Sequence, residues 1–327
     1  MRTVVGVLRG GPSSEYEVSL KSGANVLAAL DTTKYEPRDI FIDKSGQWHM
    51  RGVPLKPANA LDGVEVALNM VHGEYGEDGT LQRILDAVQV PYAGADALTS
   101  ALAFNKHRTN QSVSKLGIKV PHNTLIDSAK ITDLHKTALN IFRAMPHPFI
   151  VKPSIGGSSV GITKVNNFDA LEFALQRAFA VSPNALIEEF IPGREATVGV
   201  IDEFRNEKHY ALMPIEIVPP ASSPFFDYDA KYSGQSIERV PGYFSSEEKR
   251  ALVDAAKAVH GGLGLRHYSR SDFIVSPRGI YFLEVNPAAG IGMTNESLFP
   301  KALQAVGART ADFLDHVIQL AKNPKKN

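Results

Sequence analysis

The sequence predicts an α/β fold that opens with a mostly parallel sheet, and its N-terminal pattern carries this prediction. An apolar run from Thr3 to Leu8 is followed by the turn-forming GGPSSE and by helical spacing from Val18 to Leu30. A second apolar run, at 64–71, precedes the helical LQRILDAV and the short PYAG. Repeated strand-helix units favour parallel strands that place ligands at their carboxyl ends.

The length of the chain predicts more than one domain. Its 327 residues exceed the usual size of a single domain, and 43% of them are hydrophobic, enough for sizeable cores. We expect an N-terminal α/β domain at 1–94, a central domain at 95–189 and a C-terminal domain at 190–327. The C-terminal domain should contain the strands TVGVI, ALMPIEIV, DFIV and IYFLEVN and a helix over 310–321.

The composition excludes several classes of function. Lys and Arg together number 35, as do Asp and Glu, a balance that argues against a nucleic-acid or anionic-membrane surface and favours small ligands. The chain has no cysteine, so disulfides, thiolate metal sites and thiol catalysis are excluded. The start MRTVVGVLRGG is too short an apolar run for a signal peptide, and no run approaches the roughly 20 residues of a membrane helix. We therefore expect a cytoplasmic protein.

The stretch KPSIGGSSVG has the composition of a phosphate-covering loop. It begins with Lys152 at the end of the probable strand PFIV, and Gly156 and Gly157 let backbone N–H groups approach an anion closely. Ser158 and Ser159 add hydroxyl donors, and Lys152 adds a point charge. The alternative is an ordinary glycine-rich hairpin whose serines face water. The stretch is not a P-loop, because that pattern requires Gly-Lys-Ser/Thr at the start of a helix.

The segment SRSDFIVSPRGIYFLEVN predicts a hairpin with one polar face. A three-residue loop at 277–279 would pair Ser276 with Ile280. Counting outward from this pair brings four polar residues to one face in two facing pairs, Asp272 with Glu284 and Arg270 with Asn286. Two carboxylates and an amide oxygen beside an arginine suit Mg²⁺ held jointly with phosphates. The alternative is a solvent-facing polar face, and a slip of one residue would break the alignment.

Several motifs taken together resemble the ATP-grasp superfamily and, within it, the D-alanine:D-alanine ligase family. The superfamily pattern is carried by KPSIGGSSVG, LIEEFIPGREATV, SRSDFIV and YFLEVN, and the ligase pattern by GGPSSEYEVSLKSGANVLAAL, HGEYGEDGTLQ, FFDYDAKY and GMTNESLFP. The match covers essentially the whole chain. The resemblance implies an ATP-grasp fold with an N-terminal parallel-sheet (preATP-grasp) domain. It also implies an ADP-forming ligase that joins two D-alanines through an acyl phosphate for peptidoglycan synthesis.

The resemblance implies residues for ATP and for metal. Those implied for ATP are Lys106, Lys152, Ser159, Glu188, Ile191, Glu195 and Lys231, with Glu188 and Ile191 at the adenine and Glu195 at the ribose. Those implied for two Mg²⁺ ions, which Mn²⁺ could replace, are Asp272, Glu284 and Asn286.

The resemblance also implies residues for the amino acids and for catalysis. Glu15 would receive the ammonium of the first D-alanine, with Ser158 and Tyr232 beside it, and His72 and Ser297 would also bind substrate. Arg270 and the Gly292 N–H would stabilise the oxyanion of the tetrahedral intermediate. The segment FFDYDAKYSGQ would close over the site and contribute Lys231 and Tyr232. The family further implies a homodimer.

The residues themselves leave alternatives open. Without the family pattern, Glu15 would be a first-turn helix acid, His72 a buried structural histidine and Lys106 a solvated lysine. The segment PAAGI at 287–291 is about two residues longer than the family's loop, so a D-serine or D-lactate acceptor stays possible, although Tyr232 after Ala-Lys favours an amine acceptor. A catalytically silent ATP-binding protein is a further alternative. A dinucleotide oxidoreductase is disfavoured because GGPSSE is not the GxGxxG fingerprint.

Overall fold

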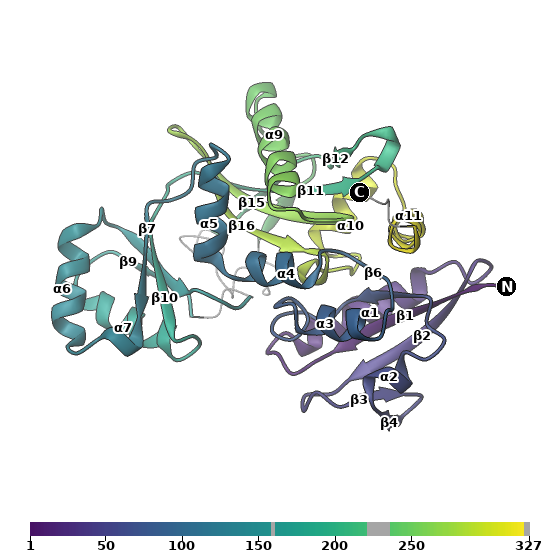
Figure 1. Cartoon of the computed structure of the whole chain (residues 1–327). Helices are drawn as coiled ribbons and strands as arrows, with labels where there is room; N and C mark the ends of the chain where they lie inside the picture. Colours follow the sequence, from purple (N-terminus) through teal and green to yellow (C-terminus); the bar gives the residue numbers. More distant parts are fainter. Residues whose placement is uncertain (158–160, 221–235, 324–327) are drawn as a thin grey trace.

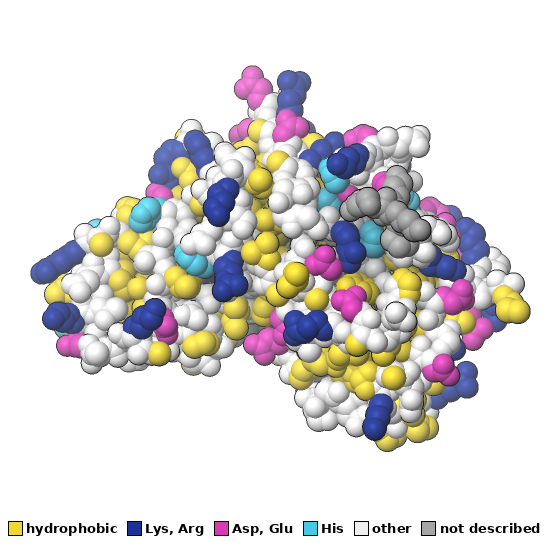
Figure 2. Space-filling view, viewed as in Figure 1, with side chains coloured by type: hydrophobic (Ala, Val, Ile, Leu, Met, Phe, Trp, Pro, Cys, Tyr) yellow, Lys and Arg dark blue, Asp and Glu magenta, His cyan; other side chains and the backbone are white. Residues whose placement is uncertain are grey.

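The computed structural model describes residues 1–157, 161–220 and 236–323, which form three sheets covered by helices (Figure 1). The α-helices are α1 (Tyr16–Ala29), α2 (Pro57–Ala60), α3 (Thr80–Ala87), α4 (Ala97–Phe104), α5 (Lys106–Lys115), α6 (Leu134–Ala144), α7 (Asp169–Phe179), α9 (Ser246–Gly262), α10 (Leu298–Ala305) and α11 (Thr310–Lys322). Within these described ranges, no helix is both long and apolar enough to cross a membrane. On the face drawn in Figure 2, basic and acidic side chains are interspersed with apolar ones.

The first sheet has a parallel centre, as the sequence predicts. Its strand order is β4 (Val53–Leu55), β3 (Trp48–Met50), β2 (Tyr35–Ile42), β1 (Thr3–Gly10), β5 (Val66–Asn69) and β6 (Tyr92–Ala93). Strands β2, β1, β5 and β6 pair in parallel, and β3 and β4 extend the edge in antiparallel pairs. β1 is central because its apolar side chains Val5, Val7 and Leu8 are fully buried.

Helix α1 is fastened to the carboxyl ends of two strands of this sheet. The Ser19 hydroxyl accepts a hydrogen bond from the Gly10 backbone N–H at 2.7 Å and donates one to the Met70 carbonyl at 2.6 Å. Gly10 ends β1 and Met70 directly follows β5. This buried double contact fixes the first turn of α1, and with it Glu15, at the edge where ligands bind in open parallel sheets.

The second sheet is antiparallel and exposes one face toward the third sheet. Its strand order is β7 (Asn123–Asp127), β10 (Asn184–Glu189), β8 (Phe149–Pro153) and β9 (Thr163–Val165). Helices α6 and α7 cover the other face, against Phe149, Val151 and Ile187. Since side chains alternate along a strand, Ile150, Lys152 and Glu188 fall on the opposite face. The predicted strand is confirmed, although it ends one residue beyond Lys152, at Pro153.

The third sheet is antiparallel and has the order β14 (Ile237–Arg239), β13 (Ile215–Val218), β11 (Arg194–Asp202), β15 (Tyr268–Ser276) and β16 (Gly279–Pro287), with β12 (His209–Ala211) paired to β11. Helix α9 packs on one face through Leu252, Ala256 and Val259. The single strand expected for ALMPIEIV is wrong. β12 ends before Pro214 and β13 begins after it, because proline has no N–H to give to a ladder.

Helices cross between the three sheets. α4 and α5 contact β16 of the third sheet, although they precede the second sheet in the chain. α11 returns to the first sheet, where Phe313 and Val317 share a core with Val5 and Val7. The domain limits expected at 94/95 and 189/190 remain predictions.

Candidate active site

A cavity of about 430 Å³ lies where the three sheets meet. Its lining residues come from β8 and β10 of the second sheet and from β11, β15 and β16 of the third sheet. The start of α1, the helix that follows β1 of the first sheet, completes the lining. Most residues expected for the site line it, namely Glu15, His72, Lys106, Lys152, Glu188, Ile191, Glu195, Arg270, Asp272, Glu284, Gly292 and Ser297. Residues far apart in the sequence are thus brought to one place.

The polar hairpin face forms as predicted, but the turn and the strand register that produce it differ from the prediction. The turn is one residue shorter than expected, because Ser276 pairs with Gly279 and not with Ile280. A β-bulge between Phe273 and Asp272 then restores the register, so that Asp272 faces Glu284 and Arg270 faces Asn286. The extra residue on β16 is Leu283, which lines the cavity. The bulge therefore aims the polar pairs into the site.

Asp272 is the centre of the polar network on this face. Arg270 binds it through two contacts, Nε to Oδ1 at 3.1 Å and Nη2 to Oδ2 at 3.0 Å. Thr197 Oγ1 donates to Oδ1 at 2.5 Å, and Asn286 Nδ2 donates to Oδ2 at 3.3 Å. The bidentate geometry fixes the plane of the guanidinium group and leaves Nη1 to face another acceptor.

The charge on Arg270 is secured by the acids around it. Arg270 is buried, and burial alone would lower the pKa of its guanidinium group. The carboxylates of Asp272, Glu284 and Glu77 outweigh burial and raise that pKa above its usual value. A fixed positive charge therefore lies inside the cavity at any physiological pH.

The donor set on β15 and β16 fits Mg²⁺. The carboxylates of Asp272 and Glu284 and the amide of Asn286 are hard oxygen ligands, and Mg²⁺ prefers such ligands together with phosphate oxygens. Glu284 and Asp272 line the cavity, whereas Asn286 reaches it through its contact with Asp272. Glu284 Oε2 also lies 3.6 Å from Lys106 Nζ, so the metal ligands adjoin one of the expected phosphate-binding lysines.

Two lysines line the cavity. Lys106, at the start of α5, donates from Nζ to the Gly156 carbonyl at 2.5 Å, and its backbone N–H donates to the Ser154 carbonyl at 2.9 Å. These bonds join α5 to the glycine-rich stretch. Lys152 Nζ lies 2.6 Å from Glu188 Oε2, and both side chains are buried. The lysines are thus positioned by the protein itself.

The end of the cavity beside β10 is largely apolar. Ile150, Phe190, Ile191 and Leu283 line it, and Glu188 lies at its edge with an oxygen accepting from Asn110 Nδ2 at 2.8 Å. A flat aromatic base would be buried between these side chains, with Glu188 as its polar partner. Glu195, expected at the ribose, lines the same cavity from β11.

Glu15 lines the cavity beside the glycine-rich stretch. It is 8% exposed, and a Cβ placed on Gly157 would come 2.5 Å from its Oε2. Only a residue without a side chain allows this approach. His72 lines the cavity nearby, with Nε2 3.2 Å from Ser22 Oγ. This hydrogen bond supports the structural role of His72, and its place in the cavity supports the substrate role.

The segment after β16 leads to the start of α10. A Cβ on Gly292 would lie 2.7 Å from Ser297 Oγ, so this glycine brings its backbone close to the N-cap of α10. Ser297 Oγ accepts from the Thr294 N–H at 3.2 Å and lies 2.8 Å from Thr294 Oγ1. Hydroxyls and backbone N–H groups at a helix start suit a carboxylate.

Some expected site residues cannot be placed, and the structure adds two others. Ser158, Ser159, Lys231 and Tyr232 lie outside the described residues, as does the segment FFDYDAKYSGQ. Glu77, within HGEYGEDG, accepts from the Gly73 N–H at 2.6 Å and contributes to the charge balance of Arg270. Thr197 orients Asp272. The acidic motif HGEYGEDG could have indicated Glu77 as a site residue. Thr197 has no such local signal, because only the pairing of β11 with β15 brings it to Asp272.

Comparison with known proteins identifies relatives along the whole chain. Residues 113–319 match the family described as "D-ala D-ala ligase C-terminus", and residues 4–62 and 51–95 match "D-ala D-ala ligase N-terminus". A D-alanine–D-alanine ligase of Flavobacterium psychrophilum is 34% identical, covering 98% of each chain. One from Syntrophobacter fumaroxidans is 36% identical, again covering 98% of each.

Solved structures with the same fold include ligases of this kind. The VanG D-Ala:D-Ser ligase from Enterococcus faecalis has a TM-score of 0.83 at 29% identity, covering 98% of this chain and all of that one. D-alanyl-alanine synthetase A from Vibrio cholerae has the same TM-score at 26% identity, covering 98% of each chain. These likenesses confirm the predicted ATP-grasp fold class.

Proposed function

This chain belongs to the D-alanine–D-alanine ligase family, and we propose that it joins two D-alanine molecules to D-alanyl-D-alanine with conversion of ATP to ADP and phosphate. The dipeptide would serve peptidoglycan precursor synthesis. The observation that carries the proposal is one cavity lined by Arg270, the carboxylates of Asp272 and Glu284, two lysines and the buried Glu15. A protein that only bound ATP would have no use for the buried arginine.

The first step is transfer of the γ-phosphoryl group to the first amino acid. A carboxylate oxygen of D-alanine attacks the γ-phosphorus, and the bond to the bridging oxygen of ADP breaks, which gives an acyl phosphate. Lys106 and Lys152 would position and neutralise the phosphates. Mg²⁺, when bound by Asp272, Glu284 and Asn286, supplies further charge neutralisation at the phosphate oxygens.

The second step is attack by the amine of the second D-alanine on the acyl carbon. The amine attacks in its neutral form, negative charge develops on the carbonyl oxygen, and phosphate then leaves with the oxygen that came from the first carboxylate and takes up the proton that the amine loses. Arg270, held by Asp272, would present Nη1 to this oxyanion, together with the Gly292 N–H. Preorganised donors of this kind contribute about 3 kcal/mol each to the stability of a transition state.

The two amino acids would be recognised by opposite charges. Glu15 would bind the ammonium group of the first D-alanine, since it is a buried acid beside the glycine-rich stretch. The carboxylate of the second D-alanine would lie at the start of α10, beside Ser297. His72 would face the first site. Ser158, Ser159, Lys231 and Tyr232 keep the roles that the sequence implies.

The proposal also includes the metal ions, the cellular location and the oligomeric state. We expect two Mg²⁺ ions, replaceable by Mn²⁺, because three oxygen ligands adjoin the triphosphate position. We also expect a cytoplasmic homodimer in which each chain binds its own substrates, with no nucleic acid or membrane as partner. Light scattering of the purified protein would measure the oligomeric state, and a monomer at micromolar concentration would contradict the dimer.

A D-serine acceptor is the second candidate. The E. faecalis structure, which bears the name D-Ala:D-Ser ligase, has the same fold. In this chain Ala288 and Ala289 are buried and Gly290 lies close to the Glu77 carboxylate, so the longer 287–291 segment is packed against the protein where we place the acceptor. Competition between D-alanine, D-serine and D-lactate, with products identified by mass spectrometry, tests this. A dominant D-alanyl-D-alanine product supports the main proposal, and a dominant mixed product contradicts it.

A further inference from the structure

A second group of ligating side chains lies on the face of the third sheet that α9 covers. Asp202 ends β11, His209 begins β12 and His260 lies in the last turn of α9. Asp202 is two residues from Val200, which packs in the core under α9, whereas Arg270 of the cavity pairs with Gly199, so the group and the cavity lie on opposite faces of the sheet. The group is therefore distinct from the ATP site.

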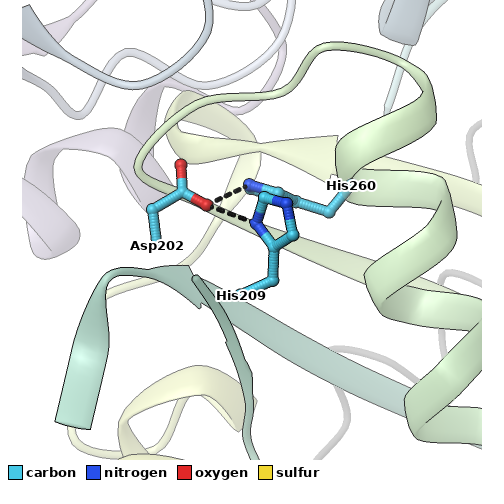
Figure 3. Close-up of side chains that lie close together, drawn as sticks. All are labelled: Asp202, His209 and His260. Carbon is cyan, nitrogen blue, oxygen red and sulfur yellow. Dashed lines mark hydrogen bonds and ion pairs between the residues drawn. The ribbon is translucent and has the colours of Figure 1, made fainter. Parts of the chain in front are cut away.

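The three side chains converge on one oxygen atom (Figure 3). Asp202 Oδ1 lies 2.8 Å from His209 Nδ1 and 3.0 Å from His260 Nε2. All three ligand atoms lie within 4.8 Å of one another. Tetrahedral zinc with bonds near 2.0 Å separates its ligand atoms by about 3.3 Å, so small side-chain shifts would admit the ion.

In His260 and Asp202, the atoms that would not bind metal are held by other groups. His260 Nδ1 lies 2.7 Å from Ser269 Oγ, and Asp202 Oδ2 accepts from the His267 backbone N–H at 2.6 Å. In metal sites the second nitrogen of a histidine and the second oxygen of a carboxylate are commonly fixed by such contacts, which set the tautomer and orientation. The group thus has its outer contacts as well as its ligand atoms.

The three side chains differ in their exposure to solvent. The His260 side chain is fully buried, whereas those of Asp202 and His209 are 18% and 24% exposed. A bound ion would be anchored from the protein side and could take water as its fourth ligand from the other side. Imidazole nitrogens suit zinc better than Mg²⁺ or Ca²⁺, and zinc also accepts a carboxylate oxygen as a ligand.

We propose that Asp202, His209 and His260 form a site for a divalent transition-metal ion, zinc being the best match. Its role is structural, since the three ligands tie the β11–β12 turn to the end of α9. His267 connects the same group to the end of β6 in the first sheet, because its Nδ1 accepts a hydrogen bond from the Gly94 N–H. The alternative is a carboxylate that only accepts hydrogen bonds from two histidines, which would need no metal.

Zinc titration of the full chain distinguishes a zinc site from a hydrogen-bonded group that needs no metal. The protein is stripped with a chelator, desalted and titrated with zinc chloride by calorimetry, and the metal retained after desalting is counted. We expect the wild type to retain one zinc that His209→Ala loses, with affinity falling at least tenfold. Zinc should raise the melting temperature of the wild type and leave that of His209→Ala unchanged.

Two controls exclude other zinc ligands and general damage. His135→Ala removes another histidine–carboxylate pair, 2.5 Å from Glu172, and should retain the zinc. Asp272→Asn should also retain it, which excludes the Mg²⁺ ligands as its source. If His209→Ala fails to fold, His209→Gln is used instead. Equal zinc binding by the wild type and the His209 variant, or no retained zinc in the wild type, would overturn the proposal.

Discussion

Arg270 and Asp272, two residues apart on β15, form a bidentate ion pair inside the cavity, with N–O distances of 3.1 and 3.0 Å. The pair explains how a buried guanidinium group keeps both its charge and a fixed orientation. Lysine would keep the charge but has no planar fork, so it could not hold Asp272 with two bonds and still offer a third nitrogen.

The first prediction concerns this fork. Arg270→Lys should lower kcat about 10²- to 10³-fold, as expected for loss of one oxyanion donor, while the Kd for ATP changes little. Steady-state kinetics and nucleotide titration measure the two effects. Arg309→Lys is a matched control, because Arg309 forms a similar bidentate pair with Asp312 on the surface at the start of α11. Unchanged kcat in Arg270→Lys would refute the oxyanion role.

The second prediction concerns Lys152 and Glu188. Glu188→Ala leaves a buried lysine without its partner and should destabilise the protein by about 3–5 kcal/mol. Glu188→Gln keeps a hydrogen-bond acceptor and should cost less. Urea unfolding measures both, and nucleotide titration should show weaker ATP binding for each. Equal stability of Glu188→Ala and wild type would show that the pair is not needed to hold Lys152.

The third prediction concerns the ammonium site. Glu15→Gln should raise the KM for the first D-alanine at least tenfold while ATP affinity is kept, because the variant loses the charge and keeps the shape. Glu17→Gln is the control, since Glu17 lies on the same first turn of α1 but is exposed. A KM effect of the same size in both variants would point to the helix and not to a substrate contact.

The fourth prediction concerns the metal ligands. Glu284→Gln removes one carboxylate beside Lys106, so the Mg²⁺ concentration for half-maximal activity should rise severalfold. Activity measured over a magnesium series, at saturating ATP, reports this. If the magnesium curve of the variant overlays that of the wild type, Glu284 does not bind the metal.

The fifth prediction concerns pH and the attachment of α11. Burial raises the pKa of Tyr35 to about 12, and its hydroxyl lies 2.8 Å from Asp315 Oδ1. The folded state therefore holds the proton more tightly, so its contribution to stability is complete below pH 10 and is lost as pH rises toward 12. Tyr35→Phe should flatten the fall in melting temperature over this range. The exposed Tyr243→Phe should not, and equal curves for both variants would contradict this account.

Sequence reasoning was most successful where local signals and the family pattern coincide. The first parallel strands, the strand that contains Lys152 and the polar face of the hairpin all follow from apolar patterning and turn residues. The predicted pairing across the hairpin is nevertheless correct only because two errors in the residue count cancel each other. The turn is shorter by one residue, and the bulge at Leu283 restores the count.

The bulge also explains a feature that alternation alone cannot. Phe282 and Val285 are three residues apart and would point to opposite faces of a regular strand. Both are buried in the same core because Leu283 is the extra residue between them. Bulges depend on packing across the sheet, so no pattern within one strand announces them.

The group of Asp202, His209 and His260 was missed for a similar reason. The three residues are separated by 7 and 51 positions and follow no ligand spacing. Only the pairing of β12 with β11 and the packing of α9 bring them together. Long-range clusters of this kind depend on tertiary structure and leave no local signal.

The most direct test of the central claim is transfer of an isotopic label. D-alanine labelled with ¹⁸O in its carboxylate is incubated with the protein, ATP and Mg²⁺, and both products are analysed by mass spectrometry. The account predicts D-alanyl-D-alanine together with phosphate that carries one ¹⁸O atom per molecule, because the acyl phosphate takes its bridging oxygen from the substrate. Release of unlabelled phosphate, or ATP turnover without dipeptide, would contradict it.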